Sequence, residues 1–224
     1  REKRAKFIST FGDGFDPEVL AYLDEDVREE VVSGLEIEAL ARVVDALDSD
    51  DAIAIVEDLD DADKKRLFAV IKPEERAVLE EGLTYPESSA GRLMQRELVA
   101  VPAHWTVGQT IDFMRLSDGL PEDFYVLFIV DPHFRPVGIV ALSRLLRSKR
   151  PTRIADLMEQ DFVKFEVEVD REEVAYAFQQ YGLVSAPVIN EAGRLVGRIT
   201  VDDVVEVQAE EAEEDILRLG GVSE

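Results

Sequence analysis

An aliphatic residue recurs every 12 residues through the first third of the chain. In most of these units, the third and fourth residues before it are apolar as well, as in Val31 and Val32. Spacings of one and four place side chains on a single helix face, and the residues after each unit favour a turn and a new helix start. The recurring positions are Leu23, Leu35, Leu47, Leu59, Ile71 and Leu83.

Each unit therefore predicts one short helix and its turn. A helix of about nine residues is unstable alone, so we expect the units of residues 16–84 to stack their apolar faces into a small α-solenoid of either hand. The first helix is expected to begin at Asp16-Pro17-Glu18, with the proline in its first turn. Residues 1–15 are expected to form a loosely docked arm.

The middle of the chain contains two related segments, residues 93–144 and 157–203. Leu93-Met94 aligns with Leu157-Met158, and Val137-Gly138 aligns with Val196-Gly197. In each copy a short strand precedes a helix with a capping pattern, Thr106-x-x-Gln109 or Asp170-x-x-Glu173, and two β-rich runs joined by a turn follow. The predicted strands are 98–101, 125–130 and 136–140 in the first copy, and 162–165, 186–189 and 195–200 in the second.

Composition and charge limit the partners and the kinds of site that the chain can have. The 224 residues contain 49 acidic and 25 basic side chains, a formal net charge of −24, which repels the phosphates of nucleic acid and attracts cations. Nucleic acid is therefore not an expected partner. The absence of cysteine excludes disulfides and thiolate metal sites. No grouping of nucleophile, base and orienting acid indicates an enzyme.

The end of the chain concentrates this negative charge. The stretch EVQAEEAEED, residues 206–215, has no basic side chain, and helical spacing places its acids on two adjoining faces. Like charges packed together cost more than a domain can spare, so a hard cation such as Mg²⁺, which prefers oxygen ligands, is the expected neutralising partner. A solvated polar helix is the simpler alternative.

The duplicated module resembles a tandem CBS (cystathionine-β-synthase) domain pair. The segments YPESSAGRLMQRELVAVPAHWTVGQTIDFMR, GRLVGRITVDDVVEV and EDILRLGG together resemble the cytosolic part of the MgtE family of magnesium channels. The resemblance implies an α+β multidomain fold. Its expected parts are an N-terminal superhelical domain (1–84), CBS domain 1 (85–150), CBS domain 2 (151–207) and the start of an acidic plug helix (208–224), without the transmembrane pore.

The resemblance also implies a function and a set of ligands. In the family, several Mg²⁺ ions bridge the N-terminal domain, the second CBS domain and the plug helix, and hold the pore shut. Two positions depart from the family pattern, with Ala54 and Gly182 where an acid can stand. The implied metal ligands are Asp50, a backbone carbonyl at Gly91 or Arg92, Glu172, Asp203, Glu206, Glu211, Glu214 and Asp215.

A nucleotide site is a further expectation from the CBS resemblance. Some CBS pairs bind adenine nucleotides through an aliphatic-Pro-aliphatic stretch and a Thr-x-x-Asp sequence. The second module has Pro187, Thr200 and Asp203 at these positions, whereas the first has Arg144 in place of the acid. Half a site is thus expected for ATP.

The resemblance finally implies partners and location. A homodimer through the CBS domains is expected, at the cytoplasmic face of the cell membrane and attached to the chain's own pore domain. An adenylate-sensing module of another transporter or enzyme, and a scaffold for a basic partner, remain the alternatives.

Overall fold

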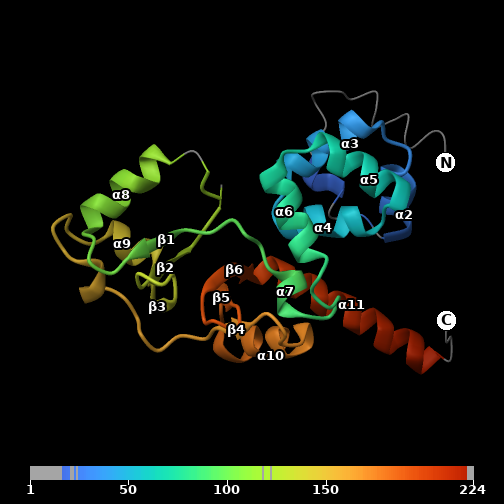
Figure 1. Cartoon of the computed structure of the whole chain (residues 1–224). Helices are drawn as coiled ribbons and strands as arrows, with labels where there is room; N and C mark the ends of the chain where they lie inside the picture. Colours follow the sequence, from blue (N-terminus) through green and yellow to red (C-terminus); the bar gives the residue numbers. More distant parts are fainter. Residues whose placement is uncertain (1–16, 21–22, 24, 118, 122, 221–224) are drawn as a thin grey trace. The chain divides into compact units, whose positions relative to one another are not determined.

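The computed structural model describes residues 17–20, 23, 25–117, 119–121 and 123–220, and for residues 18, 25–26 and 213–220 it describes the backbone alone. The chain divides into two compact units, Arg1–Thr84 and Tyr85–Glu224 (Figure 1). Each unit is described by itself. The expected arm, residues 1–15, lies outside the described residues.

The first unit consists of short helices at the predicted 12-residue spacing. Each helix packs mainly against its next-but-one neighbour, α3 on α5 and α4 on α6, rather than only on the following one. The helical repeat predicted from the sequence is confirmed. Its elements are a 3-10 turn, η2 (Pro17–Leu20), and five helices, α2 (Glu25–Val32), α3 (Ile37–Ala46), α4 (Ser49–Glu57), α5 (Asp61–Val70) and α6 (Pro73–Gly82).

The core of this unit is built from the apolar pairs that precede the recurring aliphatic residues. Val31, Val32, Ile55 and Val56 are at most 3% exposed. Of the recurring residues, Leu59 is buried and the others pack partly buried around the core, because they lie at helix ends where the chain turns. The apolar pairs thus hold the helices together.

The second unit contains two three-stranded sheets of the same topology. In the first, β1 (Ala100–Pro102) runs parallel to β2 (Val126–Val130), which pairs antiparallel with β3 (Pro136–Ala141). In the second, β4 (Phe165–Glu166), β5 (Ser185–Ile189) and β6 (Leu195–Thr200) repeat this order. The helices of the unit are α7 (Ala90–Leu93), α8 (Val107–Leu116), α9 (Leu142–Leu146), α10 (Arg171–Tyr181) and α11 (Val201–Gly220), with a 3-10 turn, η3 (Ile154–Asp156).

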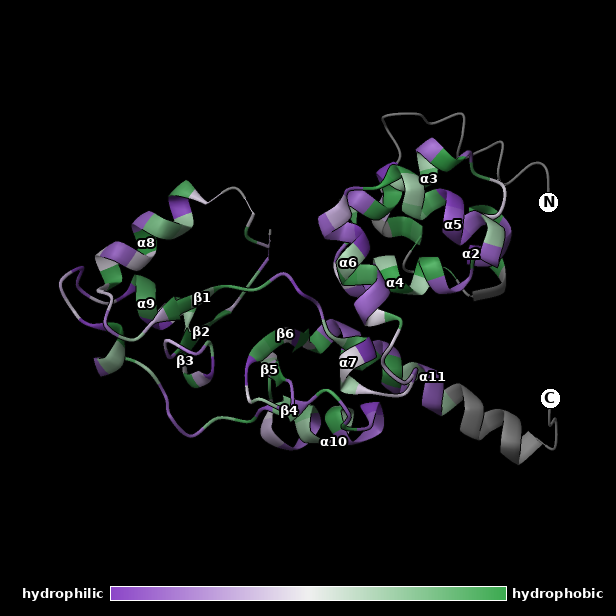
Figure 2. Ribbon diagram, viewed as in Figure 1, coloured by the Kyte–Doolittle hydropathy of each residue, from purple (hydrophilic) through white to green (hydrophobic). Residues whose placement is uncertain are grey.

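The central strands β2 and β5 are buried along almost their whole length, and Figure 2 shows mostly green, hydrophobic ribbon there. The two parallel strands are shorter and begin later than predicted, at Ala100 and Phe165, because only these residues lie opposite a partner on β2 or β5. Thr106 and Gln109 form the predicted capping box. Asp170 caps α10 through the amide of Glu172.

The two modules hold each other through exchanged lead-in segments. Gln95, which lies before the first strand of the first module, exchanges two backbone hydrogen bonds of 2.7 and 2.8 Å with Arg198 on β6 of the second. Glu159, which lies before the first strand of the second module, makes the matching bonds of 2.9 and 2.8 Å with Ile139 on β3 of the first. Each sheet is thereby extended by the other module's lead-in segment.

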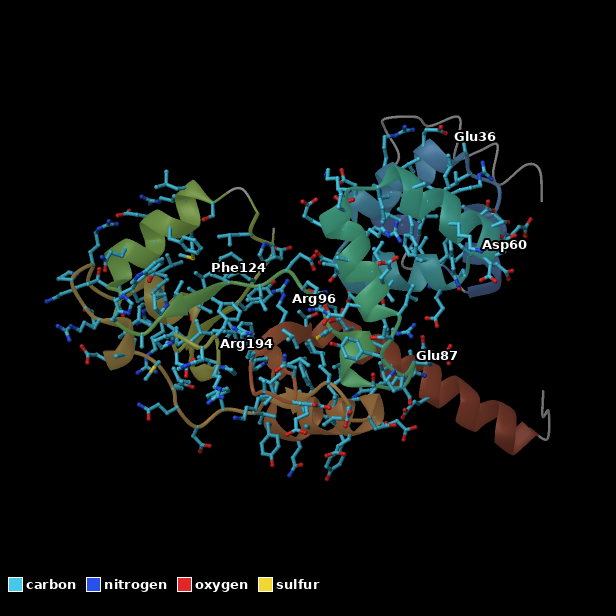
Figure 3. The ribbon with its side chains drawn as sticks, viewed as in Figure 1. Glu36, Asp60, Glu87, Arg96, Phe124 and Arg194 are labelled. Carbon is cyan, nitrogen blue, oxygen red and sulfur yellow. The ribbon has the colours of Figure 1, made fainter. Side chains whose placement is uncertain are left out.

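Two arginines labelled in Figure 3 add to this connection. The guanidinium of Arg96 donates to the carbonyl of Val196 at 3.1 Å, and Nε of Arg194 donates to the carbonyl of His133 at 3.2 Å. Both bonds run from one module to the other. These two side-chain bonds add to the backbone bonds that join the modules.

Candidate acidic and nucleotide sites

Helices α10 and α11 pack against each other, and acidic side chains meet between them. Glu172 lies in the first turn of α10, and Glu211 lies in the third turn of α11. Oε1 of Glu211 is buried without a hydrogen-bond partner among the described residues. A buried carboxylate oxygen without a donor is costly, so it favours a proton or a cation.

The electrostatics of Glu211 follow from this position. Burial raises the pKa of the Glu211 carboxyl above its usual value, and the neighbouring charge of Glu172 raises it further. Asp170 acts in the same direction, whereas Arg171 lowers the pKa. The pair Glu172 and Glu211 is the acidic site that the structure brings together.

A basic side chain, Arg171, also lies at this acidic surface. Arg171 forms an ion pair of 2.9 Å with Glu210, and its backbone amide donates to the carbonyl of Ser88 at 2.7 Å. The sequence predicted Glu172 and Glu211 as ligands, but it gave Asp170 only a capping role and did not indicate Arg171. Arg171 is the first helical residue of α10, beside the capping Asp170, which was the available signal.

Asp203 has a structural role in the described geometry. Its Oδ2 accepts hydrogen bonds from the amide and the hydroxyl of Thr200 at 2.9 and 2.6 Å, and its Oδ1 accepts one from Gln95 at 3.3 Å. These bonds fix the start of α11 on the second sheet. They leave Asp203 with less capacity for a metal ion than Glu211.

The other predicted ligands are dispersed. Glu206 is exposed on α11, while Gly91 is buried in α7 and donates its amide to the carbonyl of Val167. The guanidinium of Arg92 donates to the carbonyl of Tyr85 at 2.7 Å, and Asp50 lies half-buried in the first turn of α4, in the other unit. The predicted ligands Glu214 and Asp215 have side chains outside the described residues.

A larger metal cluster is not formed within the described part of the chain. No group of three or more His, Asp or Glu side chains there could hold a metal ion. The Glu172 and Glu211 pair fits an ion that keeps most of its water ligands and uses one or two carboxylates, which is how proteins commonly bind Mg²⁺.

The second sheet presents one polar face next to Gln95. Register and alternation place Ser185, Pro187, Arg198 and Thr200 on the same face of β5 and β6. Among the described residues, three buried atoms around this face lack hydrogen-bond partners. They are Oγ of Ser185, Nε of Arg198 and Oε1 of Gln95.

These atoms offer both donors and an acceptor beside the predicted Thr200 and Asp203. The guanidinium of Arg198 also donates twice to the carbonyl of Asp123, at 3.2 Å. In the first module Arg144 occupies the position of Asp203 and pairs with Glu159 at 2.9 Å. The first module therefore has a paired arginine where the second has the acid of its Thr-x-x-Asp sequence.

Comparison with known proteins agrees with this organisation. Residues 90–150 and 154–210 match the CBS domain family, which makes the second unit a CBS-domain pair. Residues 1–88 match the MgtE intracellular N domain. The chain belongs to the MgtE family, of which it carries the intracellular N domain and the CBS domains.

Relatives and solved structures show the same likeness. The chain is 39% identical over 158 residues to a magnesium transporter MgtE from Thermus thermophilus, across 70% of this chain and 35% of the relative. It spans about a third of the length of the curated relatives it matches. No described helix is both long and apolar enough to cross a membrane.

Two crystal structures are similar over most of the chain. The cytosolic domain of the Mg²⁺ channel MgtE in complex with ATP has a TM-score of 0.81 and 34% identity, covering 85% of this chain and 78% of that one. The soluble part of a magnesium transporter has a TM-score of 0.84 and 25% identity, covering 93% and 84%. The predicted α+β fold is confirmed.

Proposed function

We propose that this chain is the Mg²⁺-sensing and gating region of a magnesium channel or transporter, with no catalytic turnover. The observation that carries the proposal is the pair of Glu172 and Glu211, with a buried and unpartnered oxygen on Glu211. Membership of the MgtE family supports the choice of Mg²⁺ as the cation. The region would lie at the cytoplasmic face of the membrane, joined to its pore domain and paired with a second copy.

The mechanism follows from charge. Without metal, the carboxylates of α10 and α11 repel each other and any acidic surface that approaches them. Mg²⁺ ions would bind between Glu172 and Glu211, and with Glu206, Glu214, Asp215, Asp50 and a carbonyl of Gly91 or Arg92 would hold the N-terminal unit, the second CBS domain and α11 together. Loss of the ions would release them and open the pore.

The energy required is attainable by several weak ions. Moving a two-state equilibrium from 1:99 to 99:1 takes about 5.5 kcal/mol of differential binding. A few Mg²⁺ ions with affinities in the millimolar range, each bound only in the compact arrangement, would together supply it. The response would therefore be cooperative in Mg²⁺ concentration.

The test is a MgCl₂ titration followed by small-angle scattering. The expected result is a decrease of the radius of gyration with Mg²⁺, weakened in the double variant Glu172→Gln/Glu211→Gln. A matched control, Glu166→Gln/Glu168→Gln, removes two exposed acids of the same module and should respond as the unmodified chain does. No compaction at tens of millimolar Mg²⁺, or equal loss in both variants, would refute the proposal.

A second candidate function is the sensing of adenine nucleotides by the second module. The unpaired atoms of Ser185, Arg198 and Gln95 beside Thr200 and Asp203 favour it. A similar MgtE cytosolic domain was crystallised with ATP, which supports the same ligand here. Pro187 would lie beneath the base, and Asp203 would accept from the ribose hydroxyls.

Isothermal calorimetry with ATP, ADP and AMP tests this candidate. We expect binding in the unmodified chain and at least tenfold weaker binding in Asp203→Asn. The neighbouring exposed Asp202→Asn is the matched control and should bind normally. Micromolar nucleotide affinity without any Mg²⁺ response would make nucleotide sensing the primary function, and no heat with any nucleotide would remove it.

A further inference from the structure

The two CBS modules differ sharply in charge although they share a fold. Residues 90–150 contain eight basic and six acidic side chains, whereas residues 154–210 contain four basic and thirteen acidic ones. The first module thus has a net charge of +2 in a chain of −24. Its positive charge is concentrated in α9 and the residues after it.

Residues 142–153, which we call the basic segment, contain five basic side chains and no acidic one. All five are exposed. Two are paired with carboxylates, Arg144 with Glu159 at 2.9 Å and Arg150 with Asp112 at 2.6 Å. The remaining three, Arg147, Lys149 and Arg153, form no ion pair with the described residues.

The basic segment also exposes an apolar side chain and is held in a fixed shape. Leu146 is 61% exposed, while the preceding Leu145 is fully buried and anchors α9. The amides of Val107 and Gly108 donate to the carbonyls of Thr152 and Arg150 at 2.9 and 2.8 Å. Figure 2 shows this segment in purple where it leaves α9. Three free cations and one exposed leucine therefore lie on an ordered part of the surface.

We propose that the basic segment binds the anionic surface of the membrane beside which this region works. This inference rests on the proposed function, which places the chain next to a bilayer. Clustered Lys and Arg side chains are attracted to anionic headgroups, and an exposed leucine adds apolar contact at the interface. The acidic remainder of the chain would be repelled, so the attraction orients the first CBS module toward the lipid.

The alternative occupants fit less well. The acidic face of α11 in a second copy matches the charge, but its carboxylates are the proposed Mg²⁺ ligands. A copy bound through them would compete with the Mg²⁺ response. Nucleic acid offers phosphates but no apolar layer for Leu146, and the net charge of the chain repels it. Both alternatives are outcomes of the experiment below.

The experiment measures sedimentation of the full chain with vesicles, in the presence of EDTA so that Mg²⁺ cannot bridge acidic residues to lipid. Vesicles of phosphatidylglycerol and phosphatidylcholine in equal parts are compared with phosphatidylcholine alone, at 0.05 and 0.5 M NaCl. We expect binding to the anionic vesicles at low salt only. The variant Arg147→Gln/Lys149→Gln/Arg153→Gln should bind about a hundredfold more weakly, about fivefold for each charge.

A matched control removes three exposed cations of the first unit, Lys65→Gln/Arg66→Gln/Arg76→Gln, and should retain binding. Several results would overturn the proposal. They are no preference for anionic vesicles, equal loss in both variants, loss of dimerisation in the basic-segment variant, and binding to RNA but not to vesicles. If a variant fails to fold, the salt dependence of vesicle binding by the unmodified chain still tests the proposal. Mg²⁺-dependent compaction is measured without lipid, so failure of the proposed function is detected separately.

Discussion

The two CBS modules use the same buried positions and opposite surfaces. Leu145 and Val204 occupy equivalent places after the third strand and are 0% and 2% exposed, while their neighbours Leu146 and Val205 are 61% and 57% exposed. Around these matched positions the charge is reversed. Residues 142–153 have five basic side chains and no acid, and the equivalent residues 201–212 have five acids and no basic side chain.

The difference separates what sets the fold from what sets the function. The buried apolar residues set the fold of both modules, since a core accepts any set of apolar side chains that fills its volume. They place no constraint on the residues at the surface. Surface charge contributes little to stability when it is solvated, so each copy could acquire its own partner. The acidic copy is suited to a cation, and the basic copy is suited to an anionic surface.

The largest difference in stability between the two modules is expected at the exchanged lead-in segments. Gly197 faces Met94 and the carbonyl of Gln95, and Gly138 faces Met158 and the carbonyl of Glu159. A methyl group on Gly197 would lie 2.7 Å from that carbonyl oxygen and 2.7 Å from the methionine sulfur. On Gly138 the equivalent distances are both 3.0 Å. The second module is thus packed more tightly at the same position.

We therefore expect Gly197→Ala to destabilise the chain by about 2–3 kcal/mol and Gly138→Ala by about 1 kcal/mol, as overpacking of a filled site does. Urea unfolding measures both, with circular dichroism for the whole chain and fluorescence of Trp105, the single tryptophan, for the first module. Gly119→Ala, where a methyl group meets nothing within 4 Å, is the control. Equal costs at both glycines would show that the modules are packed alike.

Sequence reasoning recovered the fold because its signals are local and repeated. The apolar pairs of the first unit, such as Ile55 and Val56, and the duplicated Val-Gly of the third strands define the elements without knowledge of contacts. The predicted starts of the two short parallel strands were two and three residues too early, since these strands begin at Ala100 and Phe165. Their limits depend on which residues find a partner across the sheet, and that is a tertiary property.

The site was predictable only in part for a related reason. The acid-rich helix indicated Glu211 and the capping pattern placed Glu172 at a helix start, but the pattern could not show that these two meet. Asp203 has the right residue type for a metal, yet the structure ties it to Thr200 and Gln95. Residue type identifies candidates, and packing decides which carboxylate remains available.

The smallest expected effect is the change in stability with pH at Glu211 on α11. Glu211 has a pKa raised above its usual value of 4.5, so the folded state holds its proton more tightly than the unfolded chain does. The stability that the protonated group contributes is complete below pH 4.5 and is lost as the pH rises through the raised pKa. Position 152 in the first module, the equivalent of 211, is a threonine and has no such dependence.

Glu211→Gln should therefore match the unmodified chain at pH 4 and exceed its stability at pH 7 in EDTA, by about 0.5 kcal/mol, as for relief of a like-charge pair. For a chain of this size that is a rise in Tm of about 1–2 °C. Glu173 is an exposed acid in the same turn of α10 as Glu172, and the variant Glu173→Gln should show no pH-dependent difference in stability from the unmodified chain. Saturating Mg²⁺ should abolish the advantage, because a cation between Glu172 and Glu211 stabilises the unmodified chain and not the variant. An advantage that persists in Mg²⁺ would mean that the pair repels without binding the ion, which would contradict the proposed Mg²⁺ site between Glu172 and Glu211.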